Sequence, residues 1–473
     1  MRLTLVFTTL LGQALSIAPE TLTVATSSGS VTGFINSTFP SVRQWLGIPY
    51  AQSPTGPLRW AAPVAVSQSS KSLDVKTMPP GCMQTKAENN GPFGSQTQYQ
   101  FLIEGPVSED CLTLSVWAPN NASAGEKLPV LVWIHGGGLR EGGTSVPYQN
   151  GAPWVQRSQA HILVSVQYRL GAFGFPNSAA LASGAAGNKG QNFGLLDQRT
   201  AVEWVQKNIA GFGGDPAKIT LWGQSAGAAS VGWYTFAHWE NPIARSFIID
   251  SGGASLRMGN AMSTAIGGPF TGLAAHFNCS GAPEKELACL RQVDATRLQA
   301  FVATPAAATL NFSPLNDNVT LFKDFGIQSE AKKMAKGPAI YGFNLNEGGT
   351  FLCSQTTDLK LRAKAGLTSY FYQYRGNFTN IHPTVGAFHS FELPLVFGTH
   401  GIVNGQSTAF EKETSEKMQD LWLAFLKDPE KGLPQAGWKS YNDGAVELLG
   451  DSLASVSAKN ALVSDIPGYS ACK

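Results

Sequence analysis

The sequence predicts an α/β fold in which helices flank a central, mostly parallel sheet on both faces. Three apolar, β-prone runs are typical of strands that are buried on both faces: Leu128–Ile134, Ile162–Tyr168 and Ile219–Trp222. Between the second and third runs, Asp197–Ile209 has apolar residues at helical spacing. Strands that alternate with helices in this way favour a parallel sheet with helices on both sides.

The two ends of the chain add an N-terminal hairpin and a C-terminal helix to this pattern. Leu22–Phe34 alternates polar and apolar residues around a glycine-containing turn, which predicts an antiparallel hairpin. Phe410–Gly432 combines charges of both signs with apolar residues at helical spacing, which predicts an amphipathic surface helix. The chain has no internal repeat and no low-complexity linker. We therefore expect residues 17–473 to form a single domain.

The first residues have the pattern of a secretory signal peptide. Arg2 precedes an apolar run from Leu3 to Leu11, and small residues follow, so we expect residues 1–16 to be removed by cleavage after Ser16. This run is shorter than the roughly 20 apolar residues that span a bilayer, and we expect no transmembrane segment elsewhere. The protein is therefore expected to be secreted and extracellular.

Glycosylation motifs agree with export. The chain has six sequons, which are candidate sites for N-glycans. They lie at Asn36, Asn121, Asn278, Asn311, Asn318 and Asn377.

Charge and cysteine content exclude several functions. The net charge is +2 and charged residues make up 14% of the chain, so the sequence offers no basic field for nucleic acid. Six cysteines in an exported chain indicate three disulfides, although spacing alone allows many pairings. The histidines are scattered and no C-x-x-C pair occurs, so we expect neither a metal nor a cofactor.

A serine lies between two glycines where a predicted strand ends. Gly223-Gln224-Ser225-Ala226-Gly227 follows the run Ile219–Trp222, and the small residues after it can begin a helix. In α/β-hydrolases such a strand–turn–helix holds a nucleophilic serine on a tight turn, and small flanking residues let strand and helix pack closely. Because the motif is short, a plain glycine-rich turn is the alternative. Ser225 is a candidate nucleophile.

A second glycine motif, His135-Gly136-Gly137-Gly138, directly follows the run Leu128–Ile134. Acyl transfer places negative charge on a carbonyl oxygen, and backbone N–H groups of consecutive glycines can converge on it. In α/β-hydrolases such a turn acts together with the amide that follows the nucleophile, here that of Ala226. We expect Gly137, Gly138 and Ala226 to form an oxyanion hole, and a flexible glycine loop is the alternative.

With these motifs the chain resembles the type-B carboxylesterase/lipase family, the cholinesterase-like branch of the α/β-hydrolases. FGGDPAKITLWGQSAG (Phe212–Gly227) is similar to the serine signature of the family, and EDCLTLSVWAP (Glu109–Pro119) is similar to its second signature. YRLGAFGF (Tyr168–Phe175) and NFGLLDQRTAVEWVQKNI (Asn192–Ile209) also resemble family blocks. The resemblance runs from Pro40 to the C-terminus and looks like that of a secreted fungal-type member.

The remaining members of a catalytic triad are implied by this resemblance. A nucleophilic serine needs a base, and the base needs a carboxylate that orients it. The N-E-G block of the family matches Glu347, for which a solvated loop carboxylate is the alternative. Only His382, His389 and His400 follow Glu347, and spacing does not choose among them. HSFELPLVFG, which begins at His389, resembles the histidine block, so the resemblance favours His389.

The resemblance also implies structural partners. The cysteine pairs it implies are Cys82–Cys111, Cys279–Cys289 and Cys353–Cys472. The ion pairs it implies, as scaffold rather than chemistry, are Arg59–Glu109 and Arg169–Asp197. Ser251 is expected to lie behind the triad.

The chain departs from the family between the acid and the base. Glu347 and His389 are only 42 positions apart, whereas family members carry a far longer segment. Cys353 already belongs to the block that leads to the histidine, so the domain is shortened between 347 and 353. In the family this segment forms helices around the mouth of the site, and its loss is expected to open the pocket. The chain is either a compact variant or lacks an exon through an error in its gene model.

Two features bear on the substrate. The loop between Cys82 and Cys111, which acts as a lid in lipases of the family, is polar here and has no apolar stripe. A polar loop favours soluble esters over lipid droplets. This loop also lacks tryptophan, and Gln224 replaces an acidic residue before the nucleophile. Both features argue against a cholinesterase.

The resemblance thus implies a secreted serine carboxylester hydrolase (EC 3.1.1) acting on small-molecule esters. It would use a Ser225–Glu347–His389 triad and an acyl-enzyme intermediate. The alternatives are a lipase acting on acylglycerols and a catalytically impaired cholinesterase-like binding protein. Acyl and alcohol preference and oligomeric state stay open at this stage.

Overall fold

The computed structural model describes residues 22–66, 72–85, 102–182, 190–256, 266–402 and 405–472. The expected signal peptide, residues 1–16, lies outside these ranges, as do residues 86–101 of the loop between Cys82 and Cys111. Within the described ranges, none of the helices has the length and apolar composition that crossing a bilayer requires.

The strands and helices have the following bounds. The strands are β1 Thr23–Thr26, β2 Gly29–Thr32, β3 Phe34–Ile35, β4 Val42–Pro49, β5 Ser72–Asp74, β6 Gly81–Cys82, β7 Val107–Ser108, β8 Thr113–Pro119, β9 Leu128–Ile134, β10 Ile162–Val166, β11 Gly214–Gln224, β12 Ser246–Asp250, β13 Ala339–Asn344, β14 Ser369–Tyr374, β15 Ala445–Asp451 and β16 Val456–Leu462. The helices are α1 Ala152–Ser158, α2 Gly171–Gly174, α3 Ala179–Ala182, α4 Phe193–Asn208, α5 Ala226–Ala237, α6 Gly268–His276, α7 Pro283–Leu290, α8 Ala295–Val302, α9 Phe325–Glu330, α10 Gly349–Lys364, α11 Leu393–Phe397, α12 Ala409–Lys427 and α13 Gly432–Gln435.

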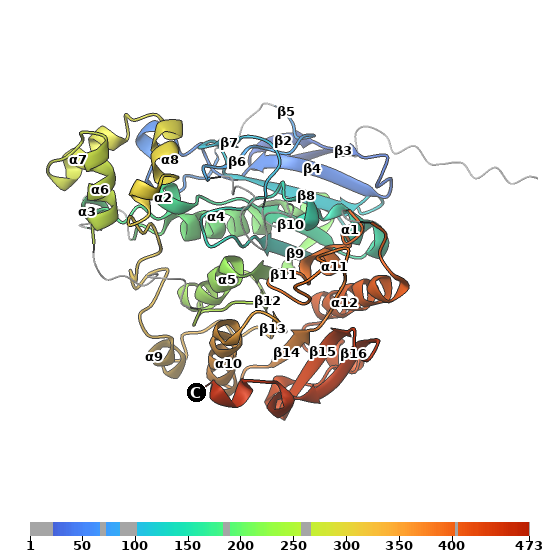
Figure 1. The fold of residues 1–473 in the computed structure, drawn as a ribbon. Coiled ribbons are helices and arrows are strands. Elements are labelled where there is room, and N and C mark those ends of the chain that lie inside the picture. The colour runs from blue at the N-terminus through green and yellow to red at the C-terminus, as the bar shows by residue number, and fades with distance from the viewer. Residues whose placement is uncertain are drawn as a thin grey trace, which may run out of the picture.

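The fold is built on an 11-stranded sheet in the order β16-β15-β14-β13-β12-β11-β9-β10-β8-β4-β3 (Figure 1). The strands from β15 to β10 in this order pair in parallel. Antiparallel pairing adds β16 at one edge and β8, β4 and β3 at the other. The predicted mostly parallel sheet is confirmed, and so is the N-terminal hairpin, because β1 and β2 pair antiparallel.

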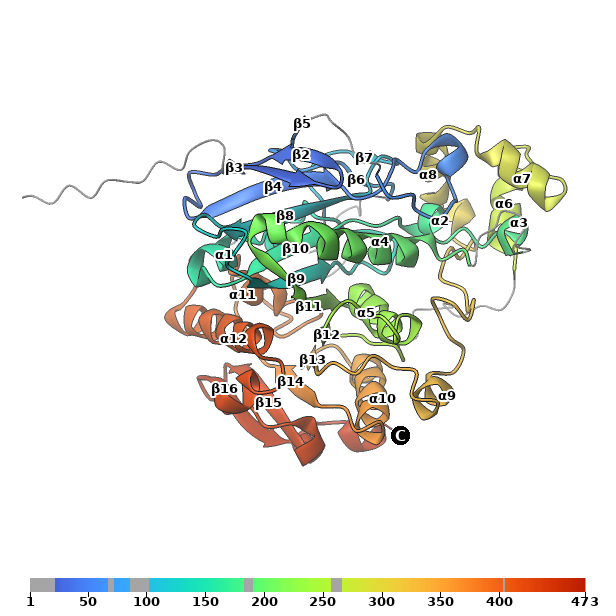
Figure 2. The same ribbon diagram turned by 180° about the vertical axis from the view of Figure 1, so that it is seen from behind.

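Helices cover the sheet on both faces because its central strands are apolar on both sides. In β9, Val130, Val132 and Ile134 belong to one apolar cluster, which also contains residues of α4 and α5. The alternate residues Leu131 and Trp133 belong to a second cluster, which contains residues of α1 and α12. Figure 2 shows α4, α5 and α10 on the same side of the sheet. An unbroken apolar run is therefore what a strand in this position requires.

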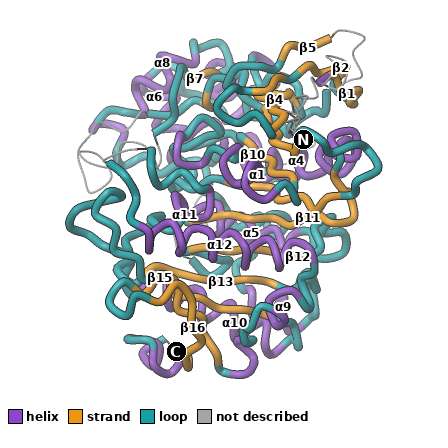
Figure 3. Tube along the Cα trace, turned by 90° about the vertical axis from the view of Figure 1, so that its right-hand side faces the viewer, coloured by secondary structure: helices purple, strands orange, loops and turns teal. Residues whose placement is uncertain are grey.

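The predicted amphipathic helix near the C-terminus is α12. Its apolar residues are buried against the sheet and α11, and its charged residues other than the buried Glu411 lie on the other side. The buried residues include Met418, Leu421, Trp422, Phe425 and Leu426. Figure 3 shows α11 and α12 next to each other, and the two helices are in contact.

A smaller helical layer lies beyond one end of the sheet. Figure 1 shows α3, α6, α7 and α8 gathered there, away from α10 and the C-terminus. Their apolar residues form a third cluster around Trp60, Phe270 and Leu290. The disulfide Cys279–Cys289 lies in this layer. The segment that contains α8 and continues to residue 312 supplies one wall of the cavity described below.

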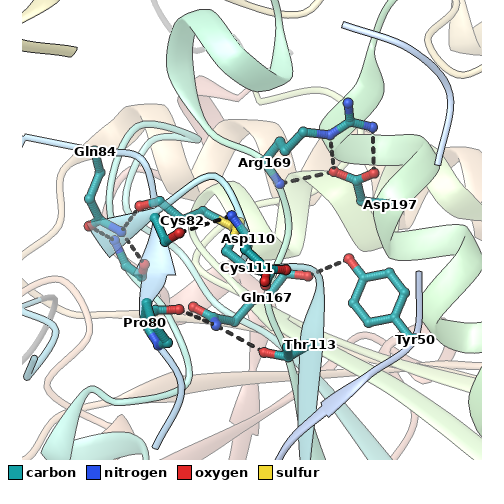
Figure 4. Close-up of a disulfide and its surroundings, with 12 residues drawn as sticks. Tyr50, Pro80, Cys82, Gln84, Asp110, Cys111, Thr113, Gln167, Arg169 and Asp197 are labelled. Carbon is teal, nitrogen blue, oxygen red and sulfur yellow. Dashed lines mark hydrogen bonds and ion pairs between the residues drawn. A yellow bond between two sulfur atoms is a disulfide. The ribbon is translucent and has the colours of Figure 1, made fainter. Parts of the chain in front are cut away.

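The six cysteines form the three disulfides that the family resemblance implied, Cys82–Cys111, Cys279–Cys289 and Cys353–Cys472. The two expected ion pairs are also formed. Arg59 and Glu109 are 2.6 Å apart, and Arg169 and Asp197 are 2.7 Å apart with both side chains buried. Figure 4 shows the second pair near the Cys82–Cys111 bridge. These charges stabilise the scaffold that carries the site.

Candidate active site

Ser225 occupies the turn between β11 and α5. Its φ of 57° and ψ of −121° are rare for a residue with a side chain. A Cβ atom at Gly223 would lie 2.3 Å from the carbonyl oxygen of Gly227, and one at Gly227 would lie 2.0 Å from that of Ile134. Only glycine fits at either position. The close approach of strand and helix presents Ser225 at the end of β11.

His389 contacts Glu347 across two separate loops. The His389 Nδ1 and Glu347 Oε1 atoms are 2.7 Å apart, and the Glu347 side chain has no exposed surface. The other carboxylate oxygen of Glu347 accepts a hydrogen bond of 2.9 Å from the backbone N–H of Asn344, the last residue of β13. Both carboxylate oxygens are therefore held, and the second nitrogen of the imidazole faces away from the carboxylate.

The second nitrogen of His389 lies beside the turn that carries Ser225. The Nε2 atom is 3.3 Å from Nε2 of Gln224, the residue before Ser225. In this arrangement the amide donates and the ring nitrogen accepts. Ser225 and His389 line one cavity of about 510 Å³, together with Gly137 and Gly138. The residue that the sequence proposed as nucleophile and the one proposed as base therefore face a common space.

The two other histidines that follow Glu347 lie elsewhere. His382 Nδ1 accepts hydrogen bonds from the backbone N–H groups of Thr384 and Val385, at 3.2 and 3.3 Å. His400 Nδ1 lies 2.6 Å from the hydroxyl of Ser407. Neither histidine is among the residues that line the cavity. Geometry thus separates His389 from the two candidates that spacing left open.

The glycine turn after β9 forms part of the cavity wall. Gly137 and Gly138 have φ angles of +97° and +62°, which glycine adopts without strain. The carbonyl oxygen of Gly137 accepts hydrogen bonds from the amides of Arg140 and Glu141, which closes a tight turn. Ala226 is the first residue of α5, so its amide lies at the positive end of a 12-residue helix.

His135 belongs to this turn and not to the cavity. Its ring is buried and stacks on Tyr168 with the centroids 4.4 Å apart. Burial lowers the pKa of His135 to about 4, so the ring is neutral. A Cβ atom on Gly142 would lie 2.5 Å from this ring. His135 therefore packs against the glycine turn and supports it.

Sequence reasoning missed two buried carboxyl groups near Glu347. Asp250 ends β12, and its Oδ2 accepts a hydrogen bond of 2.5 Å from the indole of Trp222. Burial raises the pKa of Asp250 to about 7. Burial, and then the charges of Glu347 and Asp250, raise the pKa of Glu392 well above its usual value. Glu392 lies three residues after His389 in the histidine block, which was the one sequence signal for it.

Ser251, which was expected behind the triad, is fully buried next to Asp250. Its backbone N–H donates to the carbonyl oxygen of Gly342 in β13 at 2.7 Å. Only Gly348 lies between Glu347 and the start of α10. Among the described residues, no group of three or more His, Cys, Asp or Glu side chains is arranged to hold a metal ion.

Comparison with known proteins identifies the family. A family model described as "Carboxylesterase family" matches residues 20–366. The chain belongs to the carboxylesterase family. The large mixed sheet flanked by helices is accordingly the α/β-hydrolase fold, and the chain is a carboxylic ester hydrolase.

Curated relatives of this carboxylesterase include fungal esterases and lipases. It is 42% identical to a chlorogenic acid esterase of Aspergillus niger over 441 residues, which covers 87% of this chain and 84% of the relative. It is 41% identical to secreted lipase 5 of Gibberella zeae over 471 residues, covering 88% and 87%. An acetylcholinesterase of Bungarus fasciatus is 36% identical over 272 residues, covering 57% and 43%. The cholinesterase-like resemblance is confirmed.

Proposed function

We propose that this carboxylesterase is a secreted serine hydrolase that cleaves soluble esters through a Ser225–His389–Glu347 triad, with residues 17–473 as one catalytic domain. One observation carries this proposal: His389 is held by Glu347 at 2.7 Å and lines the same cavity as Ser225. A base oriented by a carboxylate beside a strained serine is the arrangement that activates an alcohol as a nucleophile.

Acylation begins when the Ser225 hydroxyl attacks the ester carbonyl carbon. His389 Nε2 takes the hydroxyl proton, and Glu347 stabilises the imidazolium through Nδ1. The tetrahedral intermediate collapses as the C–O bond to the alcohol breaks, and the imidazolium returns the proton to the departing oxygen. Water then attacks the acyl-enzyme with His389 as the base, which releases the acid and restores the Ser225 hydroxyl.

The negative charge of the tetrahedral intermediate is stabilised by backbone donors. We assign this role to the amides of Gly137, Gly138 and Ala226. The first two residues line the cavity beside Ser225, and the third begins α5 directly after the nucleophile. Donors placed in advance of the reaction stabilise the oxyanion without reorganisation.

A lipase acting on acylglycerols is the second candidate. Val302, Leu310 and Phe312 give the cavity an apolar wall that suits an acyl chain, and one relative is named a secreted lipase. Rates on an emulsified triacylglycerol distinguish the two. A rate that rises sharply once the substrate concentration exceeds its solubility and an oil–water interface forms favours a lipase. A rate that depends hyperbolically on the concentration of dissolved ester favours an esterase.

Secretion is part of the proposal. It is supported by the signal-like residues 1–16, by the three disulfides and by a relative that is named as secreted. Four of the sequon asparagines are exposed, as glycosylation requires: Asn121, Asn278, Asn318 and Asn377. Activity in the culture medium, together with a loss of mass on treatment with endoglycosidase H, is the expected result.

The decisive experiment replaces the proposed nucleophile. Ser225→Ala is expected to abolish turnover of 4-nitrophenyl butyrate and labelling by a fluorophosphonate probe. Ser464→Ala, which removes an exposed hydroxyl outside the cavity, serves as the matched control and keeps both. Turnover or labelling that persists in Ser225→Ala refutes the triad. A wild-type protein that neither turns over nor labels indicates a binding protein on this fold.

A further inference from the structure

The cavity that contains Ser225 and His389 also contains a guanidinium group. Arg140 lies two residues after Gly138, in the turn that the carbonyl oxygen of Gly137 closes, is exposed, and lines this cavity. Its Nη2 atom donates a hydrogen bond of 2.9 Å to Oδ1 of Asn311. An amide oxygen is a neutral acceptor, so this contact orients the guanidinium and leaves its charge in place.

No protein carboxylate neutralises Arg140 within the part of the chain that the structure describes. The ion pairs found there do not include it. Glu141 is the adjacent residue and also lines the cavity. Burial raises the pKa of Glu141, and the guanidinium of Arg140 is not among the causes of that shift, so the two side chains do not pair. The titratable side chains of the cavity wall are Arg140, Glu141 and His389, and the guanidinium of Arg140 is the permanent cation among them.

A fixed cation in a substrate cavity has a chemical consequence. An acyl chain gains nothing from a hydrated guanidinium that an apolar side chain would not provide, and an aromatic ring gains only a weak cation–π contact by stacking on an exposed one. A carboxylate gains two parallel, charge-assisted hydrogen bonds, because the planar fork of arginine matches its two oxygens. Apolar residues of the same wall, such as Val302 and Leu310, suit the uncharged part of the same molecule.

We propose that Arg140 forms an anion-binding subsite and that the enzyme selects esters carrying a second, ionised carboxylate away from the scissile bond. This inference rests on the proposed function, because the scissile carbonyl must lie at Ser225 while the carboxylate reaches Arg140. The carboxylate belongs either to the acyl part or to the alcohol part of the ester, and the test below has one arm for each.

The test uses pairs of esters that differ only in charge. For the acyl arm, mono-4-nitrophenyl adipate is compared with its methyl ester. For the alcohol arm, chlorogenic acid is compared with its methyl ester. The readout is the ratio of kcat/KM for the anionic ester to kcat/KM for the neutral ester, at low ionic strength. We expect this ratio to exceed about 10 in one arm, the factor that corresponds to about 1.4 kcal/mol.

Substitutions at Arg140 test whether the guanidinium sets the ratio. Arg140→Gln is expected to lower the ratio about tenfold and Arg140→Glu to bring it below one. Arg140→Lys is expected to retain part of the ratio, because an ammonium group keeps the positive charge but lacks the two parallel N–H donors of a guanidinium. Arg297→Gln is the matched control, because Arg297 is exposed, lies outside the cavity wall, and its replacement changes the net charge equally. Thermal unfolding of each variant confirms that it is folded.

The outcomes separate this inference from the proposed function. A ratio near one in both arms, or a ratio that Arg140→Gln leaves unchanged, overturns the anion subsite while ester hydrolysis stands. Equal losses in Arg140→Gln and Arg297→Gln assign the selectivity to overall charge and also overturn it. If the wild-type enzyme hydrolyses neither member of any pair nor 4-nitrophenyl butyrate, the proposed function itself fails.

Discussion

The ring of Phe351 stacks on the imidazole of His389, with the centroids 4.4 Å apart and the planes at 26°. Phe351 lies in the first turn of α10, which begins two residues after Glu347. The early start of α10 therefore brings one helix turn directly against the proposed base. Glu347 holds the Nδ1 atom of the imidazole, and Phe351 covers a face of the ring.

The stacking predicts that Phe351 positions His389. Phe351→Ala is expected to lower kcat by about three- to tenfold, since an aromatic pair contributes about 0.5–1.5 kcal/mol beyond its buried area. KM is expected to change little, because Phe351 is not among the residues that line the cavity. Steady-state kinetics from pH 5 to 9 measure this, and Phe351→Tyr, which keeps a stacking ring, is expected to restore kcat. Equal kcat in the alanine variant and the wild type would contradict a positioning role.

Replacing the carboxylate that contacts His389 tests the acid. Glu347→Gln keeps the size of the side chain but removes its charge, and its amide can donate to Nδ1 and so favour the wrong tautomer. We expect kcat to fall by on the order of 10⁴, as for carboxylates of this kind in serine triads, with KM within about threefold. Glu416→Gln, on the exposed side of α12, controls for the loss of one negative charge. A Glu347→Gln enzyme that retains a tenth of its activity would exclude Glu347 as the acid.

The tight packing of the turn around Ser225 predicts that one added methyl group severely destabilises the fold. Gly227→Ala places a Cβ atom 2.0 Å from the carbonyl oxygen of Ile134. Backbone at this distance must shift, so we expect loss of soluble protein or a fall in Tm of more than about 10 °C. Gly268→Ala, at the start of α6 with no atom within 4 Å, is the control and keeps the wild-type Tm. A Gly227→Ala protein with normal Tm would show that strand and helix are not packed this closely.

The raised pKa of Asp250 predicts how stability depends on pH. Its pKa is about 7 in the folded protein, compared with a usual value of 3.8. Between these values the folded state binds more protons than the unfolded state, so this group lowers the free energy of unfolding as pH rises from about 4 to 7. Asp250→Asn does not titrate. The Tm of Asp250→Asn relative to wild type is therefore expected to rise over this range and to level off above it.

The control for this experiment is Asp420→Asn, which removes a mostly exposed carboxylate. Its Tm relative to wild type is expected to stay nearly constant over the same pH range. If Tm depends on pH from about 4 to 7 in the same way in Asp250→Asn and in the wild type, Asp250 is ionised in the folded protein throughout this range and its pKa is not raised. Differential scanning fluorimetry in buffers of matched ionic strength is sufficient for the comparison.

Local sequence patterns predicted the parts of the fold that depend on neighbouring residues. The run Leu128–Ile134 has the same bounds as β9, because a strand buried on both faces must be apolar throughout. The glycines at 223 and 227 marked the turn around Ser225, because a side chain at either position collides with backbone. The predicted run Ile162–Tyr168 is two residues longer than β10, because the chain leaves the sheet after Val166.

The sequence predicted which residues form the candidate site, but it did not predict how they are arranged in space. Family motifs pointed to Glu347 and His389, but spacing alone kept three histidines open. The 2.7 Å contact at Nδ1 of His389 separates them, and it depends on how two loops 42 positions apart meet at the end of the sheet. The stacking of Phe351 likewise follows from where α10 begins.

By itself, the sequence determined the parallel sheet, the two glycine turns at the carboxyl ends of its central strands and the membership in a family of esterases. These features follow from patterns among adjacent residues. Tertiary structure alone decided which side chains surround those turns. It brings Asp250 and Glu392 near Glu347, and Arg140 into the wall that Ser225 lines. No local pattern specifies these contacts, because they join segments far apart in the chain whose distances are set only when helices and sheet pack together.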